Sequence, residues 1–369
     1  MSGECTEFDW RGRIANAWLP DPLTSRSFVF SEPAVRAAEQ ATAALAASDG
    51  LLPANWEPLA RLLLRAEGIA SSSIEGVRAP VVEVALAELS QSATSAGWIA
   101  DNLAAVVDAL AENRPLSVEV INGWHRRLMQ HSALEPSMVG AFRTAPSWIG
   151  GTSPLDAVFV PPPAANIGHL IDDLIGFANE DHFDPVTQAA FLHAQFETIH
   201  PYGDGNGRLG RILIGWLLAR RGVIAKLPPP VSVLIARDPG GYISGLHLFR
   251  EGPIDAWVRW FAKIATAAAA QSTAMVTAVA AVLDEWHHEL IDLRADSAAR
   301  RLVPLLPQMP VVTSTTVSDL LGVSDRAARS ALDALSQRDI LAKVDVAAKG
   351  RGRPSVHYAA LRLLDVASP

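Results

Sequence analysis

A twelve-residue segment, 200–211, carries the residue types with the clearest chemical use in this chain. It reads His-Pro-Tyr-Gly-Asp-Gly-Asn-Gly-Arg-Leu-Gly-Arg. His200 suits proton transfer near neutral pH, because an unperturbed imidazole has a pKa of roughly 6.5. Asp204 is a hard oxygen ligand of the kind that Mg²⁺ takes together with phosphate oxygens. Arg208 and Arg211 present planar, permanently charged forks that match phosphate. These types predict a site that handles a polyphosphate.

The flanking sequence predicts a helix on each side of this segment. Asp184-Pro185 is typical of a helix start, and no Pro or Gly occurs in 186–199, so the histidine is expected at the end of a buried helix. Apolar side chains within 209–217 recur at i, i+3, i+4, i+7 and i+8, which predicts a second helix. The glycines of 203–207 let the start of that helix approach an anion, which its unpaired N–H groups and dipole favour.

Each residue type in the segment then has a chemical role as a hypothesis. Asn206 donates to the oxygen on which charge builds up, and His200 removes the proton of the incoming hydroxyl. A lone histidine after a helix is more often a cap or a core group, and a lone glycine-rich loop is a weak signal. Here both occur in register with two arginines, which favours function. The expected phosphate contacts are Gly203, Gly205, Asn206, Gly207, Arg208, Leu209, Gly210 and Arg211.

The segment resembles the signature of the Fic family, H-P-F-x-[DE]-G-N-G-R-x-x-R, with Tyr202 in place of phenylalanine. The resemblance implies a mainly α fold, a helical bundle with a β-hairpin flap. It also implies ATP as substrate and Mg²⁺ as cofactor. A Ser, Thr or Tyr hydroxyl of a target protein would attack the α-phosphorus, with pyrophosphate leaving. On this basis we expect a nucleotidyltransferase that AMPylates proteins.

A second segment, Ser71 to Gly76, ends an apolar helical pattern and resembles the family's inhibitory motif, [ST]-x-x-x-E-[GN]. In the family the glutamate pairs with the second arginine of the long motif, which implies a pair between Glu75 and Arg211. An arginine held by a carboxylate cannot hold the γ-phosphate, so ATP would bind in a pose unfit for in-line attack. Taken alone, the pattern is also typical of a solvated helix end. The expected inhibitory residues are Ser71, Glu75 and Gly76.

Two short apolar runs around a glycine pair predict a hairpin-like excursion. Trp148 and Ile149 precede Gly150 and Gly151, and the second run, 158–160, is followed by three prolines. An ordinary surface hairpin has the same pattern. The segment resembles the family's flap, whose edge aligns an extended target segment by backbone pairing. Trp148, Ile149, Gly150 and Gly151 are therefore the expected target-aligning residues.

Two later residues are expected on the adenine side of ATP, from the resemblance alone. Family members place a tyrosine near Tyr242, and Arg250 stands where some of them carry an asparagine. A packed core tyrosine is the alternative interpretation of Tyr242.

Composition indicates a cytoplasmic protein with more than one domain. The chain has 369 residues, a pI near 5.7, and a single cysteine, Cys5, which excludes an intrachain disulfide. Residues 1–10 lack a hydrophobic leader. The acidic balance argues against a generally nucleic-acid-binding surface. We expect no uncharged run long enough to span a bilayer, and therefore no membrane association.

Hydrophobic periodicity and composition divide the chain into four parts. Residues 1–114 are expected to form an N-terminal helical region, with an extended lead-in and an inhibitory helix at about 60–76. The catalytic domain is expected at 115–265, a helical connector at 266–300, and a separate domain at 301–369. Individual helices are expected at 34–47, 53–73, 81–89, 99–111, 118–129 and 253–294.

The C-terminal part differs in charge and pattern. Residues 301–369 contain 9 Lys and Arg and 6 Asp, a balance of +3, whereas the whole chain carries −8. Two helices around a glycine turn at 316–335, a strand at 340–344 and a basic turn at 349–354 are typical of a winged helix-turn-helix. Such modules also serve in packing, so DNA binding and a docking role both stay open.

Three classes of function follow. The leading one is a protein adenylyltransferase that Glu75 restrains through Arg211. A close relative is a bifunctional enzyme that also removes AMP, in which Glu75 acts on an attacking water. The second class is a nucleotide-sensing, DNA-binding transcriptional regulator. The third is a toxin-like module with a separate inhibitor, which the built-in Glu75 motif disfavours. A homodimer fits the family's habits, and the target protein stays open.

Overall fold

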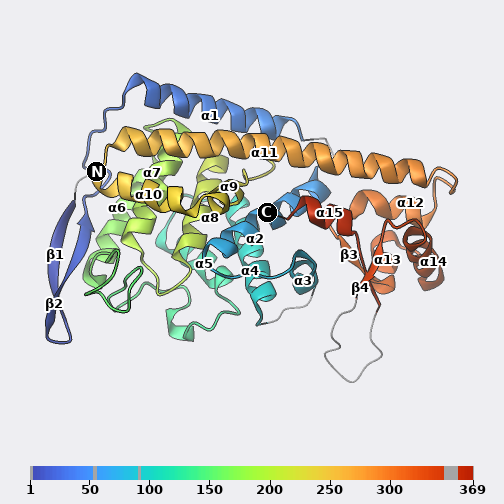
Figure 1. Ribbon diagram of the computed structural model, residues 1–369, viewed down its shortest axis with the longest axis horizontal. Helices are drawn as coiled ribbons and strands as arrows, with labels where there is room; N and C mark the ends of the chain where they lie inside the picture. Colours follow the sequence, from blue (N-terminus) through green and yellow to red (C-terminus); the bar gives the residue numbers. More distant parts are fainter. Residues whose placement is uncertain (1–2, 53–55, 90–92, 345–355, 369) are drawn as a thin grey trace.

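The computed structural model describes residues 3–52, 56–89, 93–344 and 356–368. Figure 1 shows an elongated, mainly helical molecule, with an N-terminal hairpin at one end and the C-terminal elements at the other. The predicted helices of the first third are present, with ends shifted by a few residues. They are α1 (Glu32–Gly50), α2 (Glu57–Ile74), α3 (Val81–Ala87), α4 (Ser95–Leu110) and α5 (Val118–Leu128). Residues 53–55 of the second expected helix lie outside the described residues.

The next helices surround the predicted motif: α6 (Ile167–Asn179), α7 (Pro185–Ile199), α8 (Asn206–Arg220), α9 (Val231–Arg237) and α10 (Pro239–Glu251). Asp184 caps α7 as predicted, because its carboxylate accepts from the amides of Val186 and Thr187. The single apolar face predicted for α8 was too narrow. Every residue of 206–218 is buried, since other helices pack on all sides of it. The long motif therefore joins the two central helices of the bundle.

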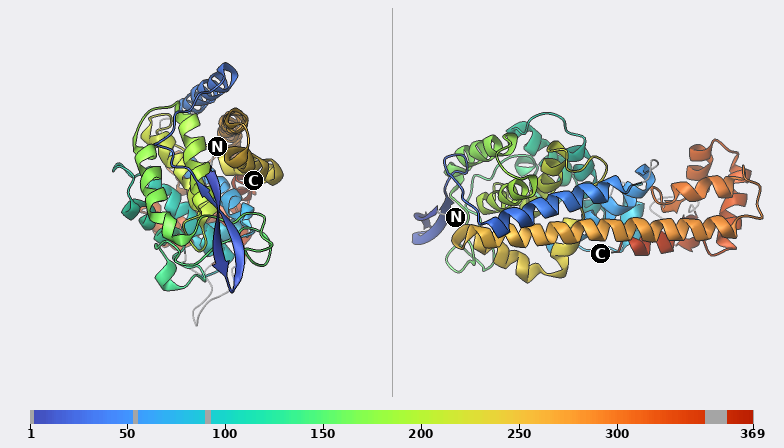
Figure 2. Two further views of the ribbon diagram at one scale, coloured as in Figure 1. Left: turned by 90° about the vertical axis from the view of Figure 1, so that its left-hand side faces the viewer. Right: turned by 90° about the horizontal axis from the view of Figure 1, so that it is seen from above.

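A 36-residue helix, α11 (Ile254–Glu289), runs beside α1 along the molecule, as Figure 2 shows from above. It begins where the long 253–294 helix was expected. The expectation that no uncharged run is long enough to cross a bilayer is wrong, because 264–283 carries no Asp, Glu, Lys or Arg. Among the described residues, α11 alone passes a test of length and apolar composition for a membrane span. Core helices of soluble proteins pass the same test.

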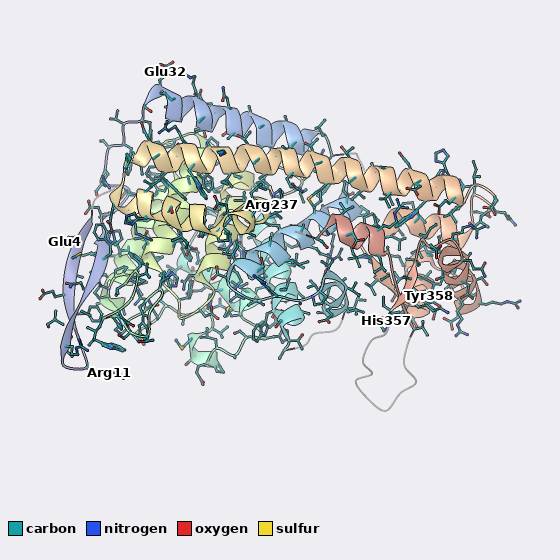
Figure 3. The ribbon with its side chains drawn as sticks, viewed as in Figure 1. Glu4, Arg11, Glu32, Arg237, His357 and Tyr358 are labelled. Carbon is teal, nitrogen blue, oxygen red and sulfur yellow. The ribbon has the colours of Figure 1, made fainter. Side chains whose placement is uncertain are left out.

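The extended lead-in is a β-hairpin that the sequence interpretation missed. Strands β1 (Gly3–Trp10) and β2 (Arg13–Pro20) pair antiparallel around a two-residue turn. Arg11 and Gly12 both have positive φ, 54° and 78°, as the favoured hairpin turn requires. Arg11 marks the hairpin tip in Figure 3. The Trp18 amide donates to Val160 O at 2.9 Å, which attaches the hairpin to the segment predicted as the flap.

The C-terminal elements are α12 (Ala298–Leu302), β3 (Val311–Val312), α13 (Ser314–Leu321), α14 (Asp325–Ser336), β4 (Ala342–Val344), β5 (His357–Ala359) and α15 (Leu361–Val366). The strands form an antiparallel sheet in the order β3-β5-β4, whose central strand carries His357 and Tyr358, labelled in Figure 3. Gly322, at φ 62°, makes the turn between α13 and α14. The basic turn expected at 349–354 lies outside the described residues. We refer to residues 298–366 as the C-terminal module.

Small side chains on α11 let it pack closely, which gives a test of the fold. Ala268 is fully buried and Ala270, two residues on, is exposed. Because the Ala268 site has no spare volume, Ala268→Leu should overpack it and lower the free energy of unfolding by about 1–3 kcal/mol. Ala270→Leu, the matched control, should change it by less than about 0.5 kcal/mol. Urea unfolding of both variants checks this, and equal effects would contradict the packing.

Candidate active site

The loop between α7 and α8 is built from two left-handed residues. His200 ends α7 with φ 49° and ψ 61°, and Gly205 precedes α8 with φ 80°. A left-handed conformation is uncommon for histidine and easy for glycine. The chain therefore reverses tightly at the end of one buried helix and starts the next one within six residues, which brings the imidazole to the start of α8.

Asn206 braces this loop from inside. Its Oδ1 accepts from the Tyr202 amide and its Nδ2 donates to Tyr202 O, both at 2.9 Å. Tyr202 itself is fully buried, and its hydroxyl donates to Asn122 Oδ1 at 2.6 Å. The tyrosine that replaces the family's phenylalanine thus has a partner for its extra hydroxyl. Sequence reasoning gave Asn206 a direct role at the phosphate, whereas this geometry gives it a bracing contact and leaves one N–H of the amide for a ligand.

His125 of α5 supports the same loop and was not singled out from the sequence. Its Nε2 donates to Asp204 O at 3.0 Å, because its Nδ1 accepts from the Gly140 amide at 2.8 Å. The ring stacks on Tyr202 with centroids 3.8 Å apart. Burial lowers the pKa of His125 to about 4, so the ring is neutral and keeps this tautomer near pH 7.

Arg143 ties His200 to the segment predicted as the flap. Its Nε donates to His200 O at 2.9 Å and its Nη2 to Pro162 O at 2.6 Å, while its amide donates to Pro201 O. One buried guanidinium thereby fixes both the backbone of the motif and the prolines that follow the 158–160 run. Arg143 was assigned no role in the sequence analysis, and no spacing rule signals such a set of carbonyl contacts.

The guanidinium of Arg211 is held by the C-terminal end of α2. Its Nε donates to Ser71 Oγ at 3.0 Å, and its Nη2 donates to Ser71 O and to Glu75 Oε1, each at 2.8 Å. Gly76, at φ 79°, turns the chain away directly after this contact. Burial would raise the pKa of Glu75, but Arg211, Arg208 and His200 outweigh it and lower the pKa. The pair named in the sequence analysis is therefore in contact and ionised.

The Glu75 carboxylate also lies over the first turn of α8. A Cβ built on Gly207 would come within 1.9 Å of Glu75 Oε1 and 3.0 Å of Arg211 Nη1. Gly207 is thus the residue that lets an anionic group sit against the helix start, where amide N–H groups and the helix dipole favour negative charge. In this conformation the anion is Glu75.

Two further motif residues lie next to each other, the exposed Asp204 and the buried Arg208. The carboxylate of Asp204 is 60% exposed and lies 3.5 Å from Nη2 of the buried Arg208. Within the described residues there is no group of three or more His, Cys, Asp and Glu side chains that could hold a metal ion by itself. One exposed carboxylate next to a helix start that favours anions fits Mg²⁺, which takes one or two carboxylates and completes its shell with phosphate oxygens and water.

The remaining glycine of the motif faces a buried carboxyl. A Cβ on Gly210 would lie 2.4 Å from Glu197 Oε1 and 3.1 Å from His193 Nδ1, so a larger residue there requires the Glu197 carboxyl to move. Glu197 Oε2 is 4.0 Å from His200 Nδ1. Burial raises the pKa of Glu197 to about 8. For His200, burial and then Arg143 lower the pKa to about 4. The imidazole is therefore neutral near pH 7 and able to accept a proton.

The segment predicted as the flap is a short, open excursion. Ile149 pairs with Phe159 in an isolated antiparallel bridge, and Gly150 and Gly151 have φ of 70° and 71°. Trp148 contacts Trp10 of β1, with ring centroids 5.4 Å apart. The hairpin and the flap therefore support each other, a contact that the sequence interpretation did not include.

Tyr242 and Arg250 both belong to α10, and the Tyr242 hydroxyl interacts with the Arg211 side chain of the motif. Tyr242 is 4% exposed, and its hydroxyl lies 2.9 Å from His193 Nε2, so its ring is enclosed in the core. This position matches the alternative interpretation of Tyr242 as a packed core tyrosine. Arg250 stacks over the Phe159 ring of the flap, with its Cζ 4.1 Å from the centroid.

Several known proteins resemble this chain. Residues 115–218 match the Fic/DOC family model. The chain is 31% identical over 157 residues to "Protein adenylyltransferase Fic" of Drosophila persimilis, and 28% identical over 155 residues to "Protein adenylyltransferase fic-1" of Caenorhabditis elegans. These matches cover 42% and 41% of this chain but 28% of each relative, so the chain spans less than a third of their length.

Solved structures share the fold over a larger part of the chain. A Fic family protein from Desulfovibrio desulfuricans superposes with a TM-score of 0.57 at 17% identity, covering 90% of this chain and 97% of that one. Residues 134–508 of Fic-1 from C. elegans give a TM-score of 0.53 at 19% identity, covering 66% of this chain and 73% of that one. The chain has a mainly helical Fic fold with small sheets, and its residues 115–218 form a Fic/DOC family domain.

Proposed function

We propose that the protein transfers AMP from ATP to a Ser, Thr or Tyr hydroxyl of a target protein, and that Glu75 restrains this reaction. The observation that carries the proposal is the grip of Ser71 and Glu75 on Arg211 at the start of α8. The carboxylate lies over a helix start that favours anions, which is where a phosphate would bind. The similarity to proteins named adenylyltransferases supports the same reaction.

In this proposal the loop residues divide the work. Backbone amides at Gly205 to Gly207 and the side chains of Arg208 and Arg211 bind the triphosphate. His200 accepts the proton of the target hydroxyl as its oxygen bonds to the α-phosphorus and pyrophosphate leaves. Asp204 is the residue that would hold Mg²⁺, which neutralises phosphate charge when bound.

Inhibition follows from competition for one guanidinium. While Nη2 of Arg211 donates to Glu75, it is not available to the γ-phosphate, and the carboxylate repels that phosphate. Departure of Glu75 exposes Arg211 and clears the helix start. A second proposal, AMP removal with Glu75 acting on a water, draws on the same placement, because the carboxylate lies over Gly207 in the same loop as His200.

For the rest of the chain we propose a cytoplasmic protein with a winged helix-turn-helix at its C-terminus. The order α13, α14, β4, β5 with β3 beside β5 supports this topology. Arg329 of α14 is paired with Asp325 on the same helix at 2.7 Å, which reduces its availability to DNA phosphates. This pairing favours a packing role of the module over DNA binding. Self-association and the identity of the target stay predictions.

Removing the Glu75 carboxylate should raise activity. We expect Glu75→Gly to label itself or lysate proteins with α-phosphate-labelled ATP at least about fivefold faster than the wild type. Glu75→Gln, which keeps the shape but loses the charge, should be intermediate. His200→Ala in the Glu75→Gly background should lower the rate by about 10²- to 10⁴-fold, the usual contribution of a general base. No labelling by Glu75→Gly, with intact folding, would exclude the proposed reaction.

The protonation state of His200 can be measured directly. Because burial and Arg143 hold its pKa at about 4, the imidazole stays neutral as the pH is lowered through the range where an exposed histidine would charge. In an NMR titration, the His200 ring signal, assigned by its loss in His200→Ala, should not move between about pH 7.5 and pH 5.5. A midpoint near 6.5 would contradict the burial of a neutral imidazole at this position.

A further inference from the structure

The helix that restrains Arg211 is also held by the C-terminal module, through Arg65. This side chain of α2 is 3% exposed. Its Nη1 donates to Pro307 O at 3.1 Å and its Nη2 to Gln308 O at 2.7 Å. Its Nε and Nη2 also donate to the two carboxylate oxygens of Glu88, the residue that follows α3. Arg65 thus connects three separate parts of the chain.

The environment makes this contact costly to lose. The guanidinium is fully enclosed, so its charge depends on Glu88 and on the two carbonyls for compensation. Conversely, withdrawal of residues 307 and 308 would leave a buried cation with half of its hydrogen bonds unmade. The positions of the module and of α2 are therefore coupled.

A second, apolar contact keeps the module in place next to α2. Ala85 of α3 packs in one cluster with Val311, Ala359 and Leu364 of the module. Figure 1 shows α3 between α2 and the strands β3 and β4. The segment 307–308 is thus held against α2 by the docking of β3 and α15 on α3.

The rigidity of α2 couples the position of Arg65 to the position of Glu75 at the site. Arg65 and Glu75 are ten residues apart, about 15 Å along a helix. No proline interrupts 59–74, and the carbonyl of its one glycine, Gly68, is held by Asn102 Nδ2 at 3.1 Å. A displacement at one end therefore moves the other end, rather than being absorbed by a bend.

We propose that the C-terminal module is an intramolecular clamp on the inhibitory helix: Arg65 bound to Pro307 and Gln308 keeps Ser71 and Glu75 on Arg211. This inference rests on the proposed function, since it concerns the regulation of the same site. Release of the 307–308 segment weakens the hold of α2 on Arg211 and raises activity. The module regulates the site without contributing a residue to it.

The test uses the full-length protein and two arginine variants. Arg65→Met keeps the aliphatic stem and removes every donor. Arg362→Met is the matched control, because Arg362 attaches the module to Glu285 of α11 and not to α2. Glu88→Gln weakens the same cluster while keeping its shape, and serves if Arg65→Met does not fold. AMP transfer and amide hydrogen exchange of residues 71–77 are measured for each, with Glu75 intact and in the Glu75→Gly background.

The clamp predicts that Arg65→Met and Glu88→Gln raise AMP transfer at least about fivefold with Glu75 intact, and leave it unchanged in Glu75→Gly. Exchange at 71–77 should accelerate in both, while Arg362→Met matches the wild type. Unchanged transfer and unchanged exchange in folded Arg65→Met, or in folded Glu88→Gln if Arg65→Met does not fold, would overturn the clamp. If Glu75→Gly itself is inactive, the proposed function fails, and the exchange data alone then decide for or against the clamp.

Discussion

The ion pair between Arg211 and Glu75 is the interaction on which the state of this site depends. A helix start that is built to bind an anion attracts the nearest one, and in this conformation that anion belongs to the protein's own α2. Both partners gain, because a buried guanidinium and an uncovered helix start would each be unfavourable alone. In the proposed function these same groups bind the triphosphate, so Glu75 and the γ-phosphate compete for Arg211.

Around this pair, the loop is held in shape by buried polar contacts rather than by apolar packing. His125 donates to the Asp204 carbonyl, and Arg143 donates to the His200 carbonyl. The Asn206 side chain accepts from the Tyr202 amide. Each contact satisfies a backbone group that a tight, left-handed turn leaves unpaired. The backbone is thus in place before any nucleotide arrives, which limits the ordering that binding has to impose.

Much of the fold could be predicted from residue types and spacing, and the failures have physical reasons. Helix starts such as Asp184 and turns such as Gly76 and Gly322 were predictable, because capping and left-handed geometry are local. The burial of α8 on all sides was not, because it depends on which helices surround it. The β1–β2 hairpin was missed because Arg11-Gly12 is an unusual turn pair. The roles of Arg65, His125 and Arg143 depend on carbonyls distant in the chain.

The close packing around Gly210 makes the residue types allowed at positions 197 and 210 depend on each other. The carboxyl of Glu197 and the ring of His193 fill the volume into which any side chain at 210 would project. A homologue with serine or threonine at the equivalent of 210 is therefore expected to carry either a shorter residue at the equivalent of 197 or a carboxyl that has moved away. Substitutions at these two positions are expected to covary. Aligned sequences should rarely combine glutamate at the equivalent of 197 with a β-branched residue at the equivalent of 210.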